Sequence, residues 1–242
     1  MTGRAVERTV AIDCFPERAA CYRDGHAIVA IDVIRATTTA ITAVALGRRC
    51  YPVSTIEQAA LLAARLPHSL LAGELGGHTP DGFAFGNSPA AVAERDDVAR
   101  PMILLSTSGT RLICESGGAA AVYAACLRNV SAQVAHLADH HQRAALIGAG
   151  ARGEFREEDQ LCCAWIAEGL LRRGFVAENE KTERLIERWT GVSVERILES
   201  KSAVYLRDAG RLDDLEFILA HVDDLDCVFT YRENEIVAVT HP

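Results

Sequence analysis

Long hydrophobic runs are missing from this 242-residue sequence. No segment reaches the length of about 20 apolar residues that a transmembrane helix needs. The opening letters, MTGRAVERTV, contain no apolar core of the kind that a secretory signal peptide has. These absences predict a protein with no membrane partner.

Cysteine pairs with C-x-x-C spacing are missing too, although the chain has eight cysteines. None of them forms a C-x-x-C pair with another, so we do not expect a structural zinc site. Most lie in apolar stretches, which is the usual setting of buried, reduced thiols in a cytosolic protein. We therefore predict a cytoplasmic location.

Positive charge is scarce. The chain has 25 lysines and arginines against 33 aspartates and glutamates, and its net charge of −8 argues against nucleic acid as a partner. A small anionic substrate is still allowed, because a few local arginines outweigh the net charge at close range. Internal repeats and low-complexity tracts are also absent. The sequence is also compatible with a homo-oligomer.

Apolar segments of strand length alternate with helical segments over most of the chain. With 49% apolar residues, the chain can bury a sizeable core. The alternation predicts βαβ units around a largely parallel sheet. We therefore predict one α/β domain over residues 1–242, with three α/β/α layers and a mixed sheet. Strands are expected near Val10, Ala27, Cys50, Ser69, Met102, Ala120 and Ala144, and helices over 36–46, 56–66, 89 onward and 157–173.

The character of the sequence changes near Glu178. Charged helical segments dominate from there, which predicts a helical lobe over residues 178–225. From Cys227, two strand-like runs flank Arg232-Glu233-Asn234, and this pattern predicts a hairpin that closes the chain.

Asp32 and Arg35 stand out because they interrupt an apolar segment, Ala27 to Gly47. A buried carboxylate costs several kcal/mol, roughly, unless it is paired or bound to a metal. Ligands of open α/β sheets bind where strands end and helices begin, and these residues fall at such a point. A structural salt bridge that caps the helix explains the pair equally well.

Polar groups occur in four loops that follow apolar strands, at 32–35, 73–89, 106–111 and 148–159. In a doubly wound sheet these loops converge in one pocket. Their hydroxyls, glycine amides and arginines suit a phosphate ester, and their carboxylates suit Mg²⁺. We predict that Asp32, Glu74, Glu158 and Asp159 are the catalytic groups and the metal ligands. The predicted substrate-binding residues are Arg35, Thr37, Asn87, Ser88, Thr107, Ser108, Gly109, Thr110 and Arg111.

Simpler interpretations exist for two of these loops. A turn with hydroxyl caps accounts for the segment 106–110, and acids in a first helical turn stabilise a helix without any function. The loop 148–153 also matches the dinucleotide pattern G-x-G-x-x-G. Its context is poor, because an acidic cluster follows and no second strand does, so a nicotinamide oxidoreductase is the third choice of function.

Taken in order, these motifs resemble those of the 2-phosphosulfolactate phosphatase family of ComB-like proteins, which belongs to coenzyme M biosynthesis. The resemblance covers nearly the whole chain. It rests on DVIRATTT from Asp32, on GE at Gly73 with GF at Gly82 and GNSP at Gly86, on TSGTR from Thr107, and on the set Gly150, Gly153, Phe155, Glu158 and Asp159. A late pattern, Ser200 to Leu206, then Asp214, then Cys227, fits as well.

The resemblance implies a magnesium-dependent phosphatase on an α/β/α fold. It also implies the substrate, a small phosphorylated organic acid: 2-phosphosulfolactate would give 3-sulfolactate and phosphate.

Three positions depart from the family pattern. Leu75 stands where the family has arginine, Ala84 where it has aspartate, and Ser108 where asparagine is usual. Two charged groups are thereby replaced by apolar ones. The alternative function is therefore a non-catalytic protein that binds a small anion on the same fold.

Overall fold

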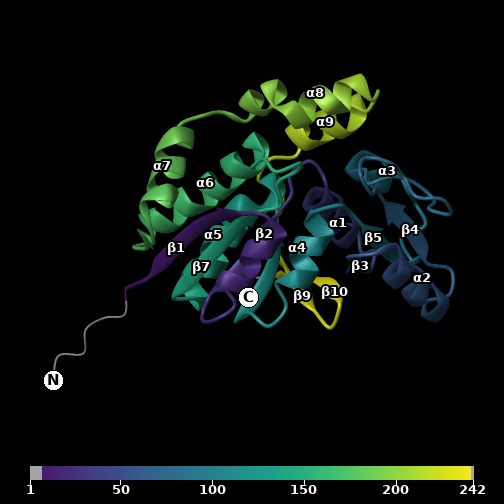
Figure 1. Cartoon of the computed structure of the whole chain (residues 1–242), viewed down its shortest axis with the longest axis horizontal. Coiled ribbons are helices and arrows are strands. Elements are labelled where there is room, and N and C mark those ends of the chain that lie inside the picture. Colours follow the sequence, from purple (N-terminus) through teal and green to yellow (C-terminus); the bar gives the residue numbers. More distant parts are fainter. Residues whose placement is uncertain (1–6, 241–242) are drawn as a thin grey trace.

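The structure is a computed structural model that describes residues 7–240. Within this range ten strands form one mixed sheet with helices on both faces, which confirms the predicted α/β class (Figure 1). The strands are β1 Thr9–Cys14, β2 Ala27–Ile31, β3 Cys50–Val53, β4 Leu70–Gly73, β5 Met102–Leu105, β6 Ala121–Ala125, β7 Arg143–Gly148, β8 Val176–Ala177, β9 Cys227–Arg232 and β10 Glu235–Thr240.

Helices follow most of the strands, as the alternating pattern predicts. The α-helices are α1 Ala36–Ala45, α2 Ile56–Arg65, α3 Pro89–Ala93, α4 Gly109–Glu115, α5 Val130–His140, α6 Glu157–Arg172, α7 Glu180–Trp189, α8 Lys201–Asp208 and α9 Leu212–Ala220. Short 3₁₀ helices are η1 Pro16–Cys21, η2 Leu127–Asn129 and η3 Val194–Glu199.

Two groups of parallel strands make up the sheet, and the predicted C-terminal hairpin joins them. The order is β4-β5-β3-β10-β9-β6-β2-β7-β1-β8. β10 is antiparallel to β3 and to β9, and β9 is antiparallel to β6. The hairpin is thus confirmed, and it lies in the middle of the sheet.

Sheet twist explains how the strand ends of the two groups meet. Because three successive pairings are antiparallel, the strands of one parallel group run in the opposite direction to those of the other. Each step between neighbouring strands adds about 20–25° of rotation, and the steps from β5 to β2 accumulate on the order of 100°. The opposed groups are therefore inclined to each other. Gly109, just after β5, packs directly against Asp32, just after β2.

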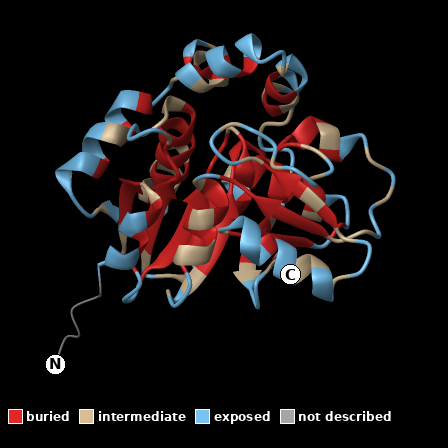
Figure 2. Ribbon diagram, turned by 45° about the vertical axis from the view of Figure 1, so that its right-hand side comes forward, coloured by how far each residue is buried: buried red, intermediate tan, exposed pale blue. Residues whose placement is uncertain are grey.

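The central strands are buried on both faces, as a parallel sheet requires. In β2, Val29 and Ile31 pack in a core with α5, α6 and α7, whereas Ile28 and Ala30 pack in a second core with α1, α4 and η1. Figure 2 shows these strands as a buried layer between helices with exposed outer faces. The helix α2 covers β3 and β5 in a smaller cluster.

The segment predicted as a helical lobe is helical as expected, but its parts pack differently. α7 contacts α6 and β1 and so belongs to one layer of the sandwich. α8 and α9 lie together across the ends of the strands (Figure 1), where Ala203, Leu206 and Leu215 form a separate small cluster. This second part is the one that reaches the site described below.

Two further expectations can be compared with the described residues. All eight cysteines are free, and most are buried, although Cys21 is exposed. In the range 7–240, no helix is both long and apolar enough to cross a membrane.

Candidate active site

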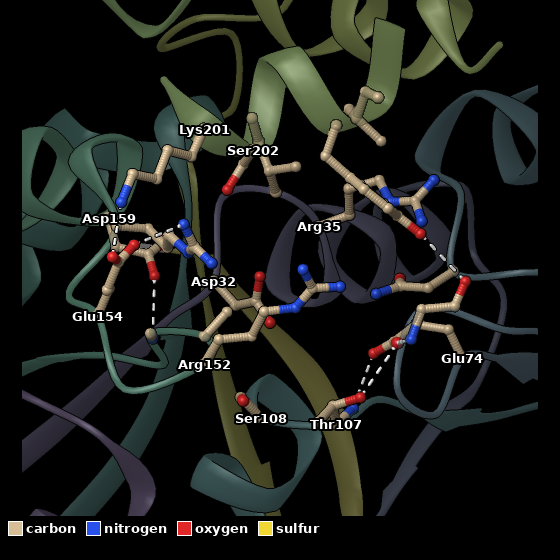
Figure 3. Close-up of a pocket in the computed structure, with 18 of the residues that line it drawn as sticks. Asp32, Arg35, Glu74, Thr107, Ser108, Arg152, Glu154, Asp159, Lys201 and Ser202 are labelled. Carbon is tan, nitrogen blue, oxygen red and sulfur yellow. Dashed lines mark hydrogen bonds and ion pairs between the residues drawn. The ribbon is translucent and has the colours of Figure 1, made fainter. Parts of the chain in front are cut away.

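A cavity of about 450 Å³ lies where the loops after β2, β4, β5 and β7 meet α8 (Figure 3). The convergence of these four loops agrees with the arrangement predicted from the sequence. The predicted site residues that line the cavity are Asp32, Arg35, Glu74, Asn87, Thr107, Ser108 and Asp159.

Asp32 is a buried carboxyl group at the end of β2. Burial raises its pKa to about 7; the Ala36 amide opposes the shift, and the negative charges of Glu74 and Glu158 add to it. The proposed salt bridge with Arg35 is not formed, because Arg35 pairs with another residue. Asp32 is therefore a buried acid held without a direct cationic partner.

The turn that presents Asp32 is fixed by Thr37. The Thr37 hydroxyl accepts a hydrogen bond from the Asp32 amide (2.9 Å) and donates one to the Asp32 carbonyl (2.8 Å). Gly109 packs against the carboxyl from the other side, where a Cβ would overlap Asp32 Oδ2 and Ala36 Cβ. Thr37 and Gly109 thus lie behind Asp32 and outside the cavity lining.

Asp159 and Glu158 stand at the start of α6. Together with Asp32 they form a cluster of three buried acids, called the acidic group below. Asp159 Oδ1 accepts from the Val33 amide (2.9 Å) and Oδ2 from the Gly150 amide (3.3 Å), so this carboxyl joins the loops after β2 and β7. Burial raises the pKa of Asp159 well above its usual range, and Asp32 and Glu158 raise it further. Burial also raises the pKa of Glu158, whose Oε2 is buried without a hydrogen-bond partner.

The contacts of Asp159 also bear on the dinucleotide interpretation. The Gly150 amide, which would face a pyrophosphate in a G-x-G-x-x-G loop, already donates to a carboxylate. At Gly148, a Cβ would overlap the Phe155 ring, so this glycine serves the packing of the protein itself. The loop 148–153 does not form a dinucleotide site.

Glu74 lines the cavity but is held by its own surroundings. Its Oε1 accepts from the Thr107 amide (2.8 Å), and its Oε2 accepts from the Thr107 hydroxyl (3.0 Å) and the Gly77 amide (2.6 Å). Figure 3 shows Glu74 turned toward Thr107 at one side of the cavity. The carboxylate therefore ties the loop after β4 to the loop after β5.

Arg35 enters the site from the start of α1 and is anchored by Asp214 of α9. Its Nη1 lies 2.5 Å from Asp214 Oδ2, and both side chains are buried. Ser88 donates to Asp214 Oδ1 (2.5 Å) and accepts from the Ala91 amide (3.1 Å), so it caps α3 as predicted but lies outside the cavity lining. Its neighbour Asn87 lines the cavity, and Asn87 Oδ1 is buried without a partner.

Three other predicted residues lie outside the cavity lining. Thr110 is buried, and its hydroxyl accepts from the Ser106 amide (2.8 Å). Arg111 forms ion pairs with Glu17 (3.1 Å) and Glu115 (2.6 Å) on the outer side of α4. Glu158 is buried next to Asp159 in α6 and does not line the cavity. For Arg111 this differs from the prediction, because nearby acids occupy its guanidinium.

Sequence reasoning missed several residues that line the cavity. Arg152, Glu154 and Arg156 come from the loop before α6. Glu154 accepts from Arg156 (3.0 Å) and from Lys201 (2.6 Å), which lies on α8. The other missed residues are Ile34, Gly76, Gly77, Gly150, Ala151, Lys201, Ser202, Tyr205 and Leu206. The late pattern from Ser200 to Leu206 was the available signal for those on α8.

The carboxylates of the acidic group are suitable ligands for a divalent cation, but they do not form a complete set of protein ligands. In the part of the chain that the structure describes, no three His, Cys, Asp or Glu side chains are arranged as metal ligands. Mg²⁺ is usually held by one or two carboxylates, with water and substrate phosphate as the other ligands. Asp32, Glu158 and Asp159 offer buried carboxylates with raised pKa values and one unpartnered oxygen.

Fold and cavity together define a class: an α/β protein whose strand-end cavity is lined by buried acids and by basic side chains, a combination that suits a small anionic ester. Comparison with known proteins then gives the family. A model of the family described as 2-phosphosulpholactate phosphatase matches residues 15–234. The chain belongs to this family.

Individual relatives agree with the family match. A protein of Symbiobacterium thermophilum is 32% identical over 220 residues, which are 88% of this chain and 94% of the relative. A protein of Carboxydothermus hydrogenoformans is 34% identical over 170 residues, which are 70% and 68% of the two chains. One of Gloeobacter violaceus is 31% identical over 198 residues (79% and 83%). Each of the three is named "Probable 2-phosphosulfolactate phosphatase".

Proposed function

We propose that this protein is a magnesium-dependent phosphatase that hydrolyses 2-phosphosulfolactate, or a close analogue, to 3-sulfolactate and phosphate. The observation that carries the proposal is the family match over residues 15–234, which spans every loop that lines the cavity. The buried acids and the basic side chains of that cavity support it independently.

The acidic and the basic side chains of the cavity have distinct roles in the proposed reaction. Asp32 and Asp159 line the cavity and would hold the magnesium ion, and Glu158 would add negative charge beside them. When bound, the ion would offset phosphate charge and lower the pKa of a bound water. The basic side chains and the hydroxyl of Ser108 bind the anionic groups of the ester. Arg35 keeps a fixed position because Asp214 holds it.

Two of the three departures from the family pattern lie outside this machinery. Leu75 and Ala84 are exposed, and neither is among the cavity-lining residues. The two apolar replacements therefore add no apolar surface to the cavity. This favours a catalyst over the non-catalytic binding protein. Ser108 does line the cavity and retains a hydroxyl there.

Phosphate release tests the proposal directly. Purified protein is expected to release phosphate from 2-phosphosulfolactate in the presence of Mg²⁺. The release should stop when EDTA is added and resume when Mg²⁺ is restored. Calorimetry with sulfolactate on the same sample separates the two candidates. Binding without turnover, under every divalent metal tried, would replace the phosphatase by the binding protein.

A further inference from the structure

Two tight turns contribute to the cavity lining, and α8 is tied to both. In the turn 75–78, Leu75 and His78 exchange backbone hydrogen bonds (2.9 and 3.2 Å); in the turn 151–154, Ala151 and Glu154 do the same (3.0 Å each). Tyr205 donates to the carbonyl of Gly77 (3.1 Å), and Lys201 pairs with Glu154 (2.6 Å). The turns are thus held at a set position relative to α8.

The two turns differ in the charge that they offer to the cavity. The central residues of the first are Gly76 and Gly77, which have no side chains, and Leu75 does not line the cavity. The central residues of the second are Arg152 and Gly153. Figure 3 shows the Arg152 side chain reaching from this turn into the middle of the cavity.

Among the basic side chains of residues 7–240 that line the cavity, Arg152 is the free cation. The other basic side chains that line the cavity are committed: Arg35 to Asp214, and Arg156 and Lys201 to Glu154. Within residues 7–240, by contrast, no carboxylate or carbonyl holds the Arg152 guanidinium. A guanidinium without a partner can still bind a ligand anion through paired hydrogen bonds.

The backbone at Arg152 points the same way. Its φ is +51°, in the left-handed region, and Gly153 follows at +75°. Such turns favour Asn-Gly, Asp-Gly or Gly-Gly, because other residues are strained at a positive φ. An arginine without an internal contact gains nothing for the fold at this position. Its presence is explained by a contact that the protein makes with something else.

We propose that Arg152 is the specificity-determining residue that binds the second anionic group of the substrate, a sulfonate or carboxylate beside the phosphate ester. The cavity then selects small phosphate monoesters that carry such a group over esters whose remainder is neutral. The inference rests on the proposed phosphatase function and adds to it the residue that reads the acid part of the substrate.

The test is Arg152→Asn, because asparagine removes the charge but tolerates a positive φ. The matched control is Arg184→Gln, which removes a charge from an exposed position on α7. The substrates are 2-phosphosulfolactate and 2-phosphoglycerate, which carry a second anion, and glycerol 2-phosphate, which does not. The variant is expected to lose about 10- to 100-fold in kcat/KM on the first two and less than about threefold on the third. Arg152→Lys should recover part of the loss.

An equal loss on all three substrates would overturn the inference, because Arg152 would then hold the phosphoryl group. No loss on any would overturn it as well. If the unaltered protein hydrolyses none of them, the proposed function has failed, and calorimetry with sulfolactate decides the inference alone. At least tenfold weaker binding by Arg152→Asn supports it; equal binding, or no binding by the unaltered protein, overturns it.

Discussion

At the scale of single residues, the site is recognisable because it buries carboxyl groups in a way that lowers the stability of the fold. Asp32, Glu158 and Asp159 are buried together, and burial raises the pKa of each. A salt bridge would have explained Asp32 as a structural residue, but Arg35 is bound to Asp214 instead. A protein keeps buried carboxylates without cationic partners when a ligand supplies the missing charge.

This cluster predicts an unusual pH dependence for the metal-free protein. The pKa of Asp32 is about 7 in the folded state and about 4 when unfolded, so the folded state binds the extra proton between these values. Stability should therefore fall as pH rises from about 4 to 7 and stay low above 7. Asp32→Asn removes the penalty, and we expect it to be more stable than the unaltered protein at pH 8 by about 1–3 kcal/mol.

Denaturant unfolding at pH 5 and pH 8 in EDTA measures this effect. The gain should shrink or vanish at pH 5, while Mg²⁺-dependent turnover should be lost at both values. A variant that is less stable than the unaltered protein at pH 8 would show that Asp32 has a cationic partner after all.

Glu158→Gln gives a second prediction at this scale. Its Oε2 is buried and unpartnered, so the neutral amide should not destabilise the metal-free protein at neutral pH. Turnover should nevertheless be lost, and the Mg²⁺ concentration that protects against thermal unfolding should rise. Thermal melts over a Mg²⁺ titration measure both. Normal turnover per folded molecule would place the metal site elsewhere.

At the scale of elements, the chain positions the site by close contacts between strand ends. α4 approaches β2 so closely that Gly109 touches the Asp32 carboxyl. We predict that Gly109→Ala destabilises the protein by about 1–3 kcal/mol through overpacking. It should also lower kcat in the remaining folded protein, because the Cβ displaces Asp32.

Gly117→Ala is the matched control, since a Cβ there meets only the Cys114 carbonyl at 3.3 Å. Activity per folded molecule, measured after denaturant unfolding has fixed the folded fraction, separates displacement from simple instability. Equal specific activity in both variants would mean that α4 does not position the acid.

Local pattern was sufficient for most elements and for part of the site. Apolar runs of strand length and the cap at Ser88 can be read from neighbouring residues, and so can the acids at strand ends. Asp214 and Lys201 were out of reach of such reasoning. Asp214 is 179 positions from Arg35 in sequence, and Lys201 is 47 from its partner Glu154. Pairing over these distances depends on how α8 and α9 cross the sheet, which no local periodicity records.

At the scale of the whole molecule, the hairpin β9–β10 is the piece that unites the two parallel groups. Phe229 and Ile236 of this hairpin are buried in the core shared with α1 and α4. The hairpin lies between β3 and β6, so the two parallel groups are joined in the sheet only through its two strands. We therefore expect stability to depend on these residues as strongly as on the central strands.

Phe229→Ala tests this dependence. Removing the ring from a fully buried site should lower the free energy of unfolding by about 3–5 kcal/mol. Leu61→Ala, at an exposed position on α2, is the control and should change it by less than about 0.5 kcal/mol. A single cooperative transition, seen alike by far-UV circular dichroism and tryptophan fluorescence, is expected for Phe229→Ala. Separate transitions would mean that each strand group is stable without the hairpin. The cavity would then lie between two independently stable halves.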